Sequence, residues 1–534
     1  MKMKRQRQRQ SRGILTLILA LALLAGCGGQ PAVPGGQASG GGGGTSTAGA
    51  ASVTSEPDTL IVAVDSEGDT FDPFDYADLD DGFLVRQVHE PLAYLDSTSP
   101  NGFSPVLAES WEYPNDQTIL LHLRQGVMFQ NGEEMKAGDV LFSLRTTKER
   151  GLLNPNNWTN LDLDNATVID DYTLEISTFE PSSFSFSWLL SEMVSIVSEK
   201  AYAELGAGYA RNPNGGTGPY ILTDWVAGDR VTFTRNENYW GTMPQYKTLV
   251  LRFIIDGTAR TFAVESGGVD VAYSCPTADL GTLSSLDGYE VIRQVTSGVN
   301  YLWFNNNDEH LKDIRVRQAL SYALDLQTMV PIAYNNMGAV ADSVFGPSCP
   351  QKIVPDTIYR QDMDKAKQLL ADAGYGDGFD LKIIITDRAS RKTLAEMMKN
   401  IWANLNINLE IEVLELSTIL ELVFNDDYQL TIMAEGGFHG EAWRSYMHTE
   451  GVNNYSKYSN ARVDELFNLA VETSDAAEGM VYYTEMQQIF ADEVPILPMQ
   501  YDEILNVVRK GFYYSVDPTY NFMAARFYYI RYDE

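Results

Sequence analysis

The chain has 534 residues and a formal net charge of −33, with 72 acidic and 39 basic side chains. Such an acidic surface repels polyanions, and no basic stripe interleaved with aromatic residues offsets it, so the composition excludes nucleic acid as a partner. With 44% hydrophobic residues at this length, we expect a large core divided over more than one domain.

The first predicted element is an export signal. Six cations and no acid lie in the first twelve residues, and an apolar run from Ile14 to Ala25 follows. This run is shorter than the about 20 apolar residues of a permanent membrane helix, so residues 1–26 are predicted to be a signal peptide. Loss of those six cations changes the formal net charge from −33 to −39.

A cysteine ends the leader. Leu24-Ala25-Gly26-Cys27 is typical of the site at which a lipoprotein signal peptidase cuts after the cysteine has been diacylated, although an ordinary secretory signal can also end near a cysteine. We expect lipid on Cys27 to anchor the chain outside the cytoplasm. Residues 27–57 are rich in Gly, Ser and Thr and are predicted to be a flexible tether. Its length fits a cell with one membrane, but a periplasmic location in a cell with two stays open.

Two further cysteines follow the tether. Cys275 and Cys349 either form a disulfide in the oxidising compartment or remain two buried free thiols, because the sequence does not measure their separation.

Beyond the tether, strand-like and helix-like segments are mixed, which predicts an α/β fold. Alternation, capping residues and turn signals predict these elements in chain order: strands at 59–64 and 118–124, a helix capped by Asp139, one amphipathic helix at 313–330, a helix at 364–374, and a strand-helix-strand unit from Lys382 to Val413.

Four groups of motifs carry a resemblance to a known family. In chain order they lie at 103–112 with 121–132, at 216–225 with 235–241, at 304–325, and at 365–375. Together they resemble the large peptide- and nickel-type solute-binding proteins of ABC importers, known as solute-binding protein family 5. The resemblance covers nearly all of the chain from Asp58 onward.

The resemblance implies a type II periplasmic-binding-protein-like fold, with two lobes joined by two crossover strands and an additional inserted domain. Capture of the solute would be hinge closure. The implied boundaries are 58–91, 213–304 and 499–534 for lobe one, 92–212 for the inserted domain, and 305–498 for lobe two. A monomer that delivers its ligand to the permease subunits of an ABC transporter is expected.

Family members line their cleft with the loop after the first strand, the crossovers and a loop late in lobe two. By that resemblance, the ligand-binding residues are expected to be Asp78, Asp80, Tyr273, Ser274, Glu435, Gly436, Gly437, Phe438, His439, Glu441, Trp443 and Tyr501. Alanine at Trp443 or Tyr501 is expected to weaken binding and to leave the melting temperature of the empty protein nearly unchanged.

The late loop departs from the family pattern. Peptide-binding members carry an aspartate after a Gly-Trp pair, and its carboxylate receives the α-ammonium of the peptide. This chain has Gly436 to Gly440 instead, and Glu435, Glu441, Asp78 or Asp80 would have to replace that charge. Peptide stays the leading ligand class, while a nickel complex, an opine or a sugar stays open.

His439, Glu441, His448 and Glu450 invite a metal interpretation, because imidazole and carboxylate suit such ions. Their spacing matches no established ligand motif, so neither a metal site nor a cofactor is expected.

Two other functions compete with solute capture. An anchored extracellular hydrolase would need a recognisable nucleophile, and no Gly-x-Ser-x-Gly elbow occurs, so we do not expect an enzyme. A peptide-sensing receptor that lacks its own importer would share the fold and differ only in its partner.

Overall fold

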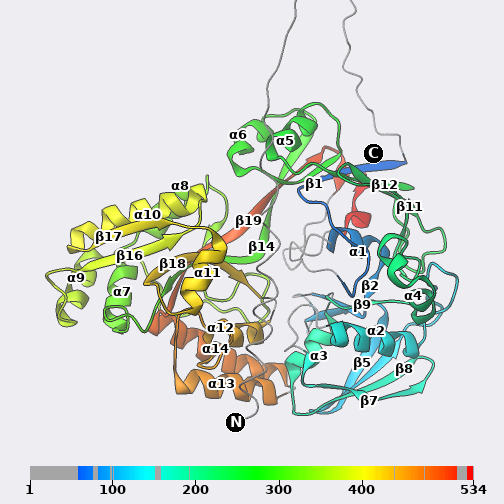
Figure 1. The fold of residues 1–534 in the computed structure, drawn as a ribbon, viewed down its shortest axis with the longest axis horizontal. Helices are drawn as coiled ribbons and strands as arrows, with labels where there is room; N and C mark the ends of the chain where they lie inside the picture. The colour runs from blue at the N-terminus through cyan, green and yellow to red at the C-terminus, as the bar shows by residue number, and fades with distance from the viewer. Residues whose placement is uncertain are drawn as a thin grey trace, which may run out of the picture. The chain divides into compact units, whose positions relative to one another are not determined.

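The computed structural model describes residues 58–75, 82–96, 99, 102–150, 158–191, 193–437, 439–473, 475–513 and 526–532. Eleven strands form one mixed sheet with the order β10-β11-β12-β1-β13-β19-β14-β18-β16-β17, and β15 pairs with β19 (Figure 1). The strands are β1 (Thr59–Val64), β10 (Tyr220–Val226), β11 (Arg230–Arg235), β12 (Thr248–Phe253), β13 (Val271–Cys275), β14 (Tyr289–Phe304), β15 (Ala339–Val340), β16 (Asp380–Ile385), β17 (Asn408–Val413), β18 (Leu430–Gly436) and β19 (Ile496–Arg509).

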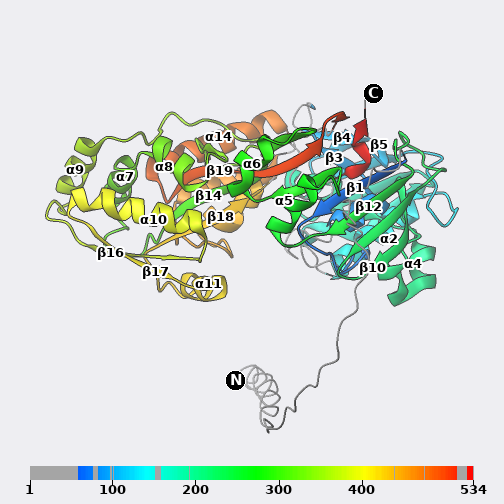
Figure 2. The same ribbon diagram turned by 90° about the horizontal axis from the view of Figure 1, so that it is seen from above.

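The two longest strands of this sheet, β14 and β19, connect its halves. They pair antiparallel and lie between β13 and β18 in the order of the sheet; Figures 1 and 2 show β14 and β19 side by side. The ladder is interrupted between the pairs Val295↔Glu503 and Val299↔Tyr501, so three residues of β14 face one residue of β19. A bulge of this kind bends a strand and increases its twist. We call the half with β10–β13 the first lobe and the half with β16–β18 the second lobe.

The second lobe is a sheet between two layers of helices. Successive strand residues point to opposite faces, so Leu302 and Phe304 pack in one core while Tyr301 and Trp303 pack in the other. One layer holds α7 (Ile314–Tyr322), α8 (Leu326–Ala333), α9 (Met363–Asp372) and α10 (Ala389–Trp402); the other holds α11 (Leu416–Phe424), α12 (Arg444–Met447), α13 (Ala461–Glu472) and α14 (Ala476–Glu493).

The first lobe follows the same rule. Leu60, Val62 and Val64 of β1 pack on one face of the sheet, and Ala63 packs on the other. Its helices are α1 (Gly82–Val88), α5 (Gly257–Glu265) and α6 (Leu280–Ser284). β1 is parallel to β12 and β13, as expected for strands that are buried on both faces.

A separate small sheet follows β3 (Ala93–Leu95) and β4 (Phe103–Pro105) in the chain. We call it, with its helices, the small-sheet region. Its order is β5-β6-β8-β7, and its core includes residues of α2 and α3. The elements are β5 (Ala108–Asn115), β6 (Thr118–Leu123), α2 (Ala137–Arg150), β7 (Leu161–Asp170), β8 (Thr173–Thr178), α3 (Ser183–Leu190) and α4 (Glu199–Leu205).

One buried carboxylate explains part of the second motif group. Glu90, in β2 (Glu90–Pro91), is 1% exposed. It accepts hydrogen bonds from the Thr217 hydroxyl at 2.8 Å, the Tyr239 hydroxyl at 2.6 Å and the Trp240 indole N–H at 2.8 Å. The motif residues at 217 and 239–240 therefore hold the chain where it leaves the first lobe.

The structure confirms the strands predicted at 59–64 and 118–124 and the strand-helix-strand unit predicted at 382–413. The single helix predicted at 313–330 is wrong. Two helices lie there, because the Asp325 side chain accepts from Thr328 N–H and starts a second one. Asp139 is not the cap of α2 either; it lies in the first turn, and its carboxylate accepts from the backbone N–H groups of Lys136 and Glu199.

The Gly216 position allows no side chain. A Cβ there would lie 2.1 Å from the Val88 carbonyl oxygen, which is backbone and cannot rotate away. We expect Gly216→Ala to lower the free energy of unfolding by about 1–3 kcal/mol or more, because close packing must be relieved by moving the chain. Gly138→Ala is the control, since no atom lies within 4 Å of a Cβ at that helical position. Urea unfolding measures both, and equal midpoints for the two variants would contradict the packing argument.

Candidate ligand-binding site

The predicted late loop begins where the second lobe meets the crossover strands. Gly436 is the last residue of β18 and pairs with Gly298, next to the bulge of β14. A Cβ on Gly436 would lie 2.8 Å from the Ser297 carbonyl oxygen, so only glycine allows this approach. The loop continues into a short helical turn, Gly440–Trp443, and then into α12.

Glu435 is the first carboxylate of the loop. It is half-buried, and its Oε2 accepts a hydrogen bond from the Tyr446 hydroxyl at 2.7 Å. Desolvation by the surrounding protein raises the pKa of the Glu435 carboxyl to about 7. Its charge therefore changes near neutral pH.

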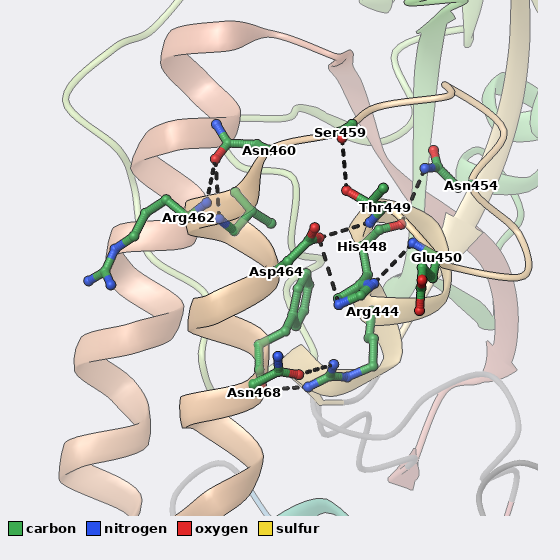
Figure 3. Close-up of polar contacts among 12 residues, drawn as sticks. Arg444, His448, Thr449, Glu450, Asn454, Ser459, Asn460, Arg462, Asp464 and Asn468 are labelled. Atoms are coloured by element: carbon green, nitrogen blue, oxygen red, sulfur yellow. Dashed lines mark hydrogen bonds and ion pairs between the residues drawn. The ribbon is translucent and has the colours of Figure 1, made fainter.

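Glu441 is the second carboxylate and is more deeply buried, at 7% exposed. Its Oε1 pairs with Arg444 Nε, while its Oε2 has no hydrogen-bond partner in the described part of the chain. Desolvation raises the pKa of Glu441 to about 7, although Arg444 opposes that shift. Arg444 also donates from Nη1 to Asn468 Oδ1 at 2.9 Å and from Nη2 to the Phe467 carbonyl (Figure 3).

His439 sits between aromatic rings. Its ring centroid lies 5.6 Å from that of Phe184 in α3 and 5.7 Å from that of Tyr483 in α14. Burial lowers the pKa of His439 to about 4, so the imidazole is neutral at physiological pH. Its Nδ1 accepts from the Glu441 N–H at 3.1 Å. His439 thus places the loop against the small-sheet region.

The two predicted aromatic contacts lie in the core beneath the loop. Trp443 is 1% exposed; its ring stacks on Phe345 at 5.8 Å and meets Tyr301 edge-on at 5.5 Å. Tyr501 is 7% exposed, and its hydroxyl donates to Asp342 Oδ1 at 2.6 Å. Their contacts within the protein hold the second lobe together.

The residues predicted from the first lobe are also engaged in the protein. Tyr273 is buried and packs edge-on against Phe83 at 5.0 Å. Ser274 has a φ of 54°, and its N–H donates to Asn506 Oδ1 at 3.0 Å. Cys275 and Cys349 are both buried free thiols, which decides between the two alternatives that the sequence left open. Asp78, Asp80, Phe438 and Cys27 lie outside the described residues.

A pocket of about 620 Å³ brings part of the predicted loop together with residues that the sequence did not indicate. Gly436 and Glu441 line it, but Glu435, Gly437, His439 and Trp443 do not. The opposite wall comes from Asn160 and from residues 180–188 around α3. An aromatic-rich run at 184–188 was the available signal for that wall. We call this space the α3 pocket.

A second pocket, of about 570 Å³, lies within the second lobe between the start of α8 and the end of α14. None of the predicted ligand-binding residues lines it.

The residues that invited a metal interpretation form no metal site in the described part of the chain. His448 Nε2 lies 3.7 Å from Asp464 Oδ1, and His448 Nδ1 accepts from the Glu450 N–H at 3.1 Å (Figure 3). Among the described residues, no group of three or more His, Cys, Asp or Glu side chains is arranged to hold a metal ion.

The sheet whose halves are joined by β14 and β19 gives the chain a two-lobed fold of type II topology. The chain belongs to the bacterial extracellular solute-binding proteins, family 5, whose Middle region matches residues 102–457. This is a family of solute-binding proteins that act outside the cytoplasm.

Individual relatives support this assignment. The dipeptide-binding protein of Escherichia coli is 27% identical over 451 residues, which cover 78% of this chain and 84% of that protein. Heme-binding protein A of Haemophilus influenzae is 26% identical over 451 residues, with 78% and 81% covered.

Solved structures show the same fold. HbpA2 from Haemophilus parasuis aligns with a TM-score of 0.79 at 21% identity, covering 89% of this chain and 100% of that one. The ABC transporter substrate-binding protein CtaP from Listeria monocytogenes aligns with a TM-score of 0.77 at 20% identity, covering 85% and 94%. In the described part of the chain, none of the helices has the length and apolar character that a membrane span requires.

The burial of Trp443 changes what its removal should do. We expect Trp443→Ala to lower the free energy of unfolding by about 3–5 kcal/mol, because it leaves a large cavity among Phe345 and Tyr301. This replaces the expectation of an unchanged melting temperature. Trp443→Phe keeps part of the ring contact and should lower the free energy of unfolding by less. Differential scanning calorimetry of the empty protein measures both, and a parent-like melting temperature for Trp443→Ala would show that the site repacks.

Glu435 should make stability depend on pH. Its pKa in the folded protein is about 7, against an ordinary value of 4.5, so the folded state holds this proton more tightly. Its contribution to stability is therefore complete below pH 4.5 and is lost as the pH rises through about 7.

Glu435→Gln, which keeps an oxygen for the Tyr446 hydroxyl, should remove that dependence. After allowance for partial exposure, we expect about 1–2 kcal/mol of relative stabilisation at pH 8 and almost none at pH 4. Glu421→Gln, on the exposed side of α11, is the control. Urea unfolding across this pH range with parallel curves for the parent and Glu435→Gln would refute the assignment.

Proposed function

We propose that this protein captures a small peptide between its two lobes and delivers it to the permease of an ABC importer. The observation that carries the proposal is the passage of one sheet through both lobes on β14 and β19, interrupted at residues 296–298. Rotation at that interruption changes the distance between the lobes and leaves each hydrophobic core intact. Ligand contacts to both lobes would then favour the closed form.

The proposed division of the chain follows these strands. Lobe one would comprise 58–91, 213–304 and 499–534, lobe two 305–498, and the inserted domain 92–212. The end of β14 at Phe304 and the start of β19 at Ile496 support these boundaries. The small-sheet region, with its own core, supports an inserted domain.

Peptide is the proposed ligand class for two reasons. Among the similar proteins are the dipeptide-binding protein of Escherichia coli and a DppA protein from Helicobacter pylori solved with a peptide. In this chain, Glu435 and Glu441 offer carboxylates that can receive an ammonium group near the crossover. Heme-binding protein A and a NikA protein solved with a nickel complex are also similar, so the ligands named for the relatives differ.

We further propose that lipid on Cys27 anchors the protein to the outer face of the cell membrane and that residues 27–57 act as a tether. The basic and apolar leader before Cys27 supports this anchor. Cys27→Ala should then release the protein from membranes. Crosslinking on cells should recover permease subunits with the parent; a receptor without its own importer would be recovered without them.

Binding and closure can be tested together. We expect heat of mixing with di- and tripeptides by isothermal titration calorimetry, and a smaller radius of gyration by X-ray scattering when peptide is bound. Mass spectrometry of the peptide afterwards should recover it intact, whereas a hydrolase would yield products. Flat heats and unchanged scattering across peptides, sugars and chelated nickel would exclude solute capture by closure.

A further inference from the structure

The α3 pocket, which Glu441 lines, has a chemical character that narrows the proposed function. Its walls come from two parts of the chain, residues 160–188 of the small-sheet region and residues 436–471 of the second lobe. A volume of about 620 Å³ is within the range of small-molecule sites. A group bound there would touch both parts at once.

The ionisable side chains that line the pocket are mostly acidic. Glu180, Glu441 and Glu450 line it, and of the described lining residues Arg444 alone is a cation at neutral pH. His448 lines it too, but burial lowers the pKa of its imidazole, so the ring is neutral there.

Arg444 does not cancel this excess. Its guanidinium is already shared among Glu441 Oε1, Asn468 Oδ1 and the Phe467 carbonyl, so it is directed at α13 (Figure 3). One carboxylate oxygen of Glu441 is thereby engaged and the other is not.

Two buried polar atoms on the wall lack partners. Glu441 Oε2 and Ser445 Oγ are buried and make no hydrogen bond among the described residues, although both side chains line the pocket. Leaving a buried carboxylate oxygen unpaired is costly, and a donor group from a ligand would remove that cost.

Aromatic rings complete the wall. Phe184 and Trp188 of α3 and Tyr446 of α12 line the pocket beside these carboxylates. The face of an aromatic ring attracts a cation, and ring surface also accommodates the alkyl chain that carries it. Acidic side chains, an unpaired acceptor and aromatic faces together favour a cationic group carried on an alkyl chain.

We propose that the α3 pocket is a specificity subsite for an alkylammonium or guanidinium group of the solute, with Glu441 as its counter-ion. The proposal rests on solute capture and narrows its substrate class to solutes with a basic side chain. Because the pocket joins α3 to the second lobe, such a solute would also oppose their separation.

The test compares matched ligands on the full-length purified protein. Tripeptides of alanine with one lysine, placed at each position in turn, are titrated beside the same peptides with norleucine, which has a similar chain without the charge. We expect at least one lysine peptide to bind about tenfold or more tightly than its norleucine counterpart. Equal affinities for every pair would overturn the subsite and leave peptide capture standing.

Variants locate the effect. Glu441→Gln should lower the affinity for the lysine peptide to that of its norleucine counterpart. Glu180 is exposed, so Glu180→Gln should fold normally and lower the affinity for the lysine peptide by a few fold. Glu421→Gln, on α11 and outside the pocket, should change neither affinity. A lysine preference that survives both pocket variants would place the cation elsewhere and overturn the proposal.

A third ligand separates this proposal from the proposed function. If no tripeptide binds, peptide capture fails, and 1,5-diaminopentane then decides the subsite. Binding of the diamine by the parent and its loss in Glu441→Gln would support a cation subsite for a non-peptide solute. No heat with the diamine would overturn the subsite as well.

Discussion

The antiparallel pairing of β14 with β19 is the constraint on which the rest of the structure depends. Both lobes are halves of one sheet, so their relative position is set by how these two strands run through the interruption at 296–298. Glycines surround that point: a Cβ at Gly346 or Gly436 would lie 2.5 or 2.8 Å from the Ser297 carbonyl oxygen. The bend is therefore enclosed by backbone on several sides, and the late loop starts from it.

Much of the fold could be predicted because its elements carry local signals. Residues close together in the sequence are enough to predict β1, β6 and the strand-helix-strand unit at 380–413. The break between α7 and α8 was missed because the apolar pattern continues across it, and only the Asp325 cap marks it. The pairing of β19 between β13 and β14 joins residues far apart in the chain, so no local pattern indicates it, and the family resemblance implied only that two strands cross between the lobes.

The site was less predictable, for a physical reason. An aromatic residue in a Gly-rich loop has the same sequence signature whether it faces a ligand or the core, and Trp443 faces the core. Glu435 and Glu441 were predicted because the family resemblance places the late loop at the cleft, and of the two only Glu441 lines the α3 pocket. The contribution of α3 depends on which distant segment packs against the loop, and no local pattern of Phe184 or Trp188 records that partner.

The place of β19 in the sheet also affects the order in which the molecule can be completed. This strand lies between β13 and β14, yet in the chain it comes after every other strand of the sheet. The two halves of the sheet cannot be joined until residues 496–509 have paired with β13 and β14, and pairings of such long range form slowly. A polypeptide that crosses a membrane before it folds gains time from this arrangement, because the sheet cannot be completed until β19 has been translated.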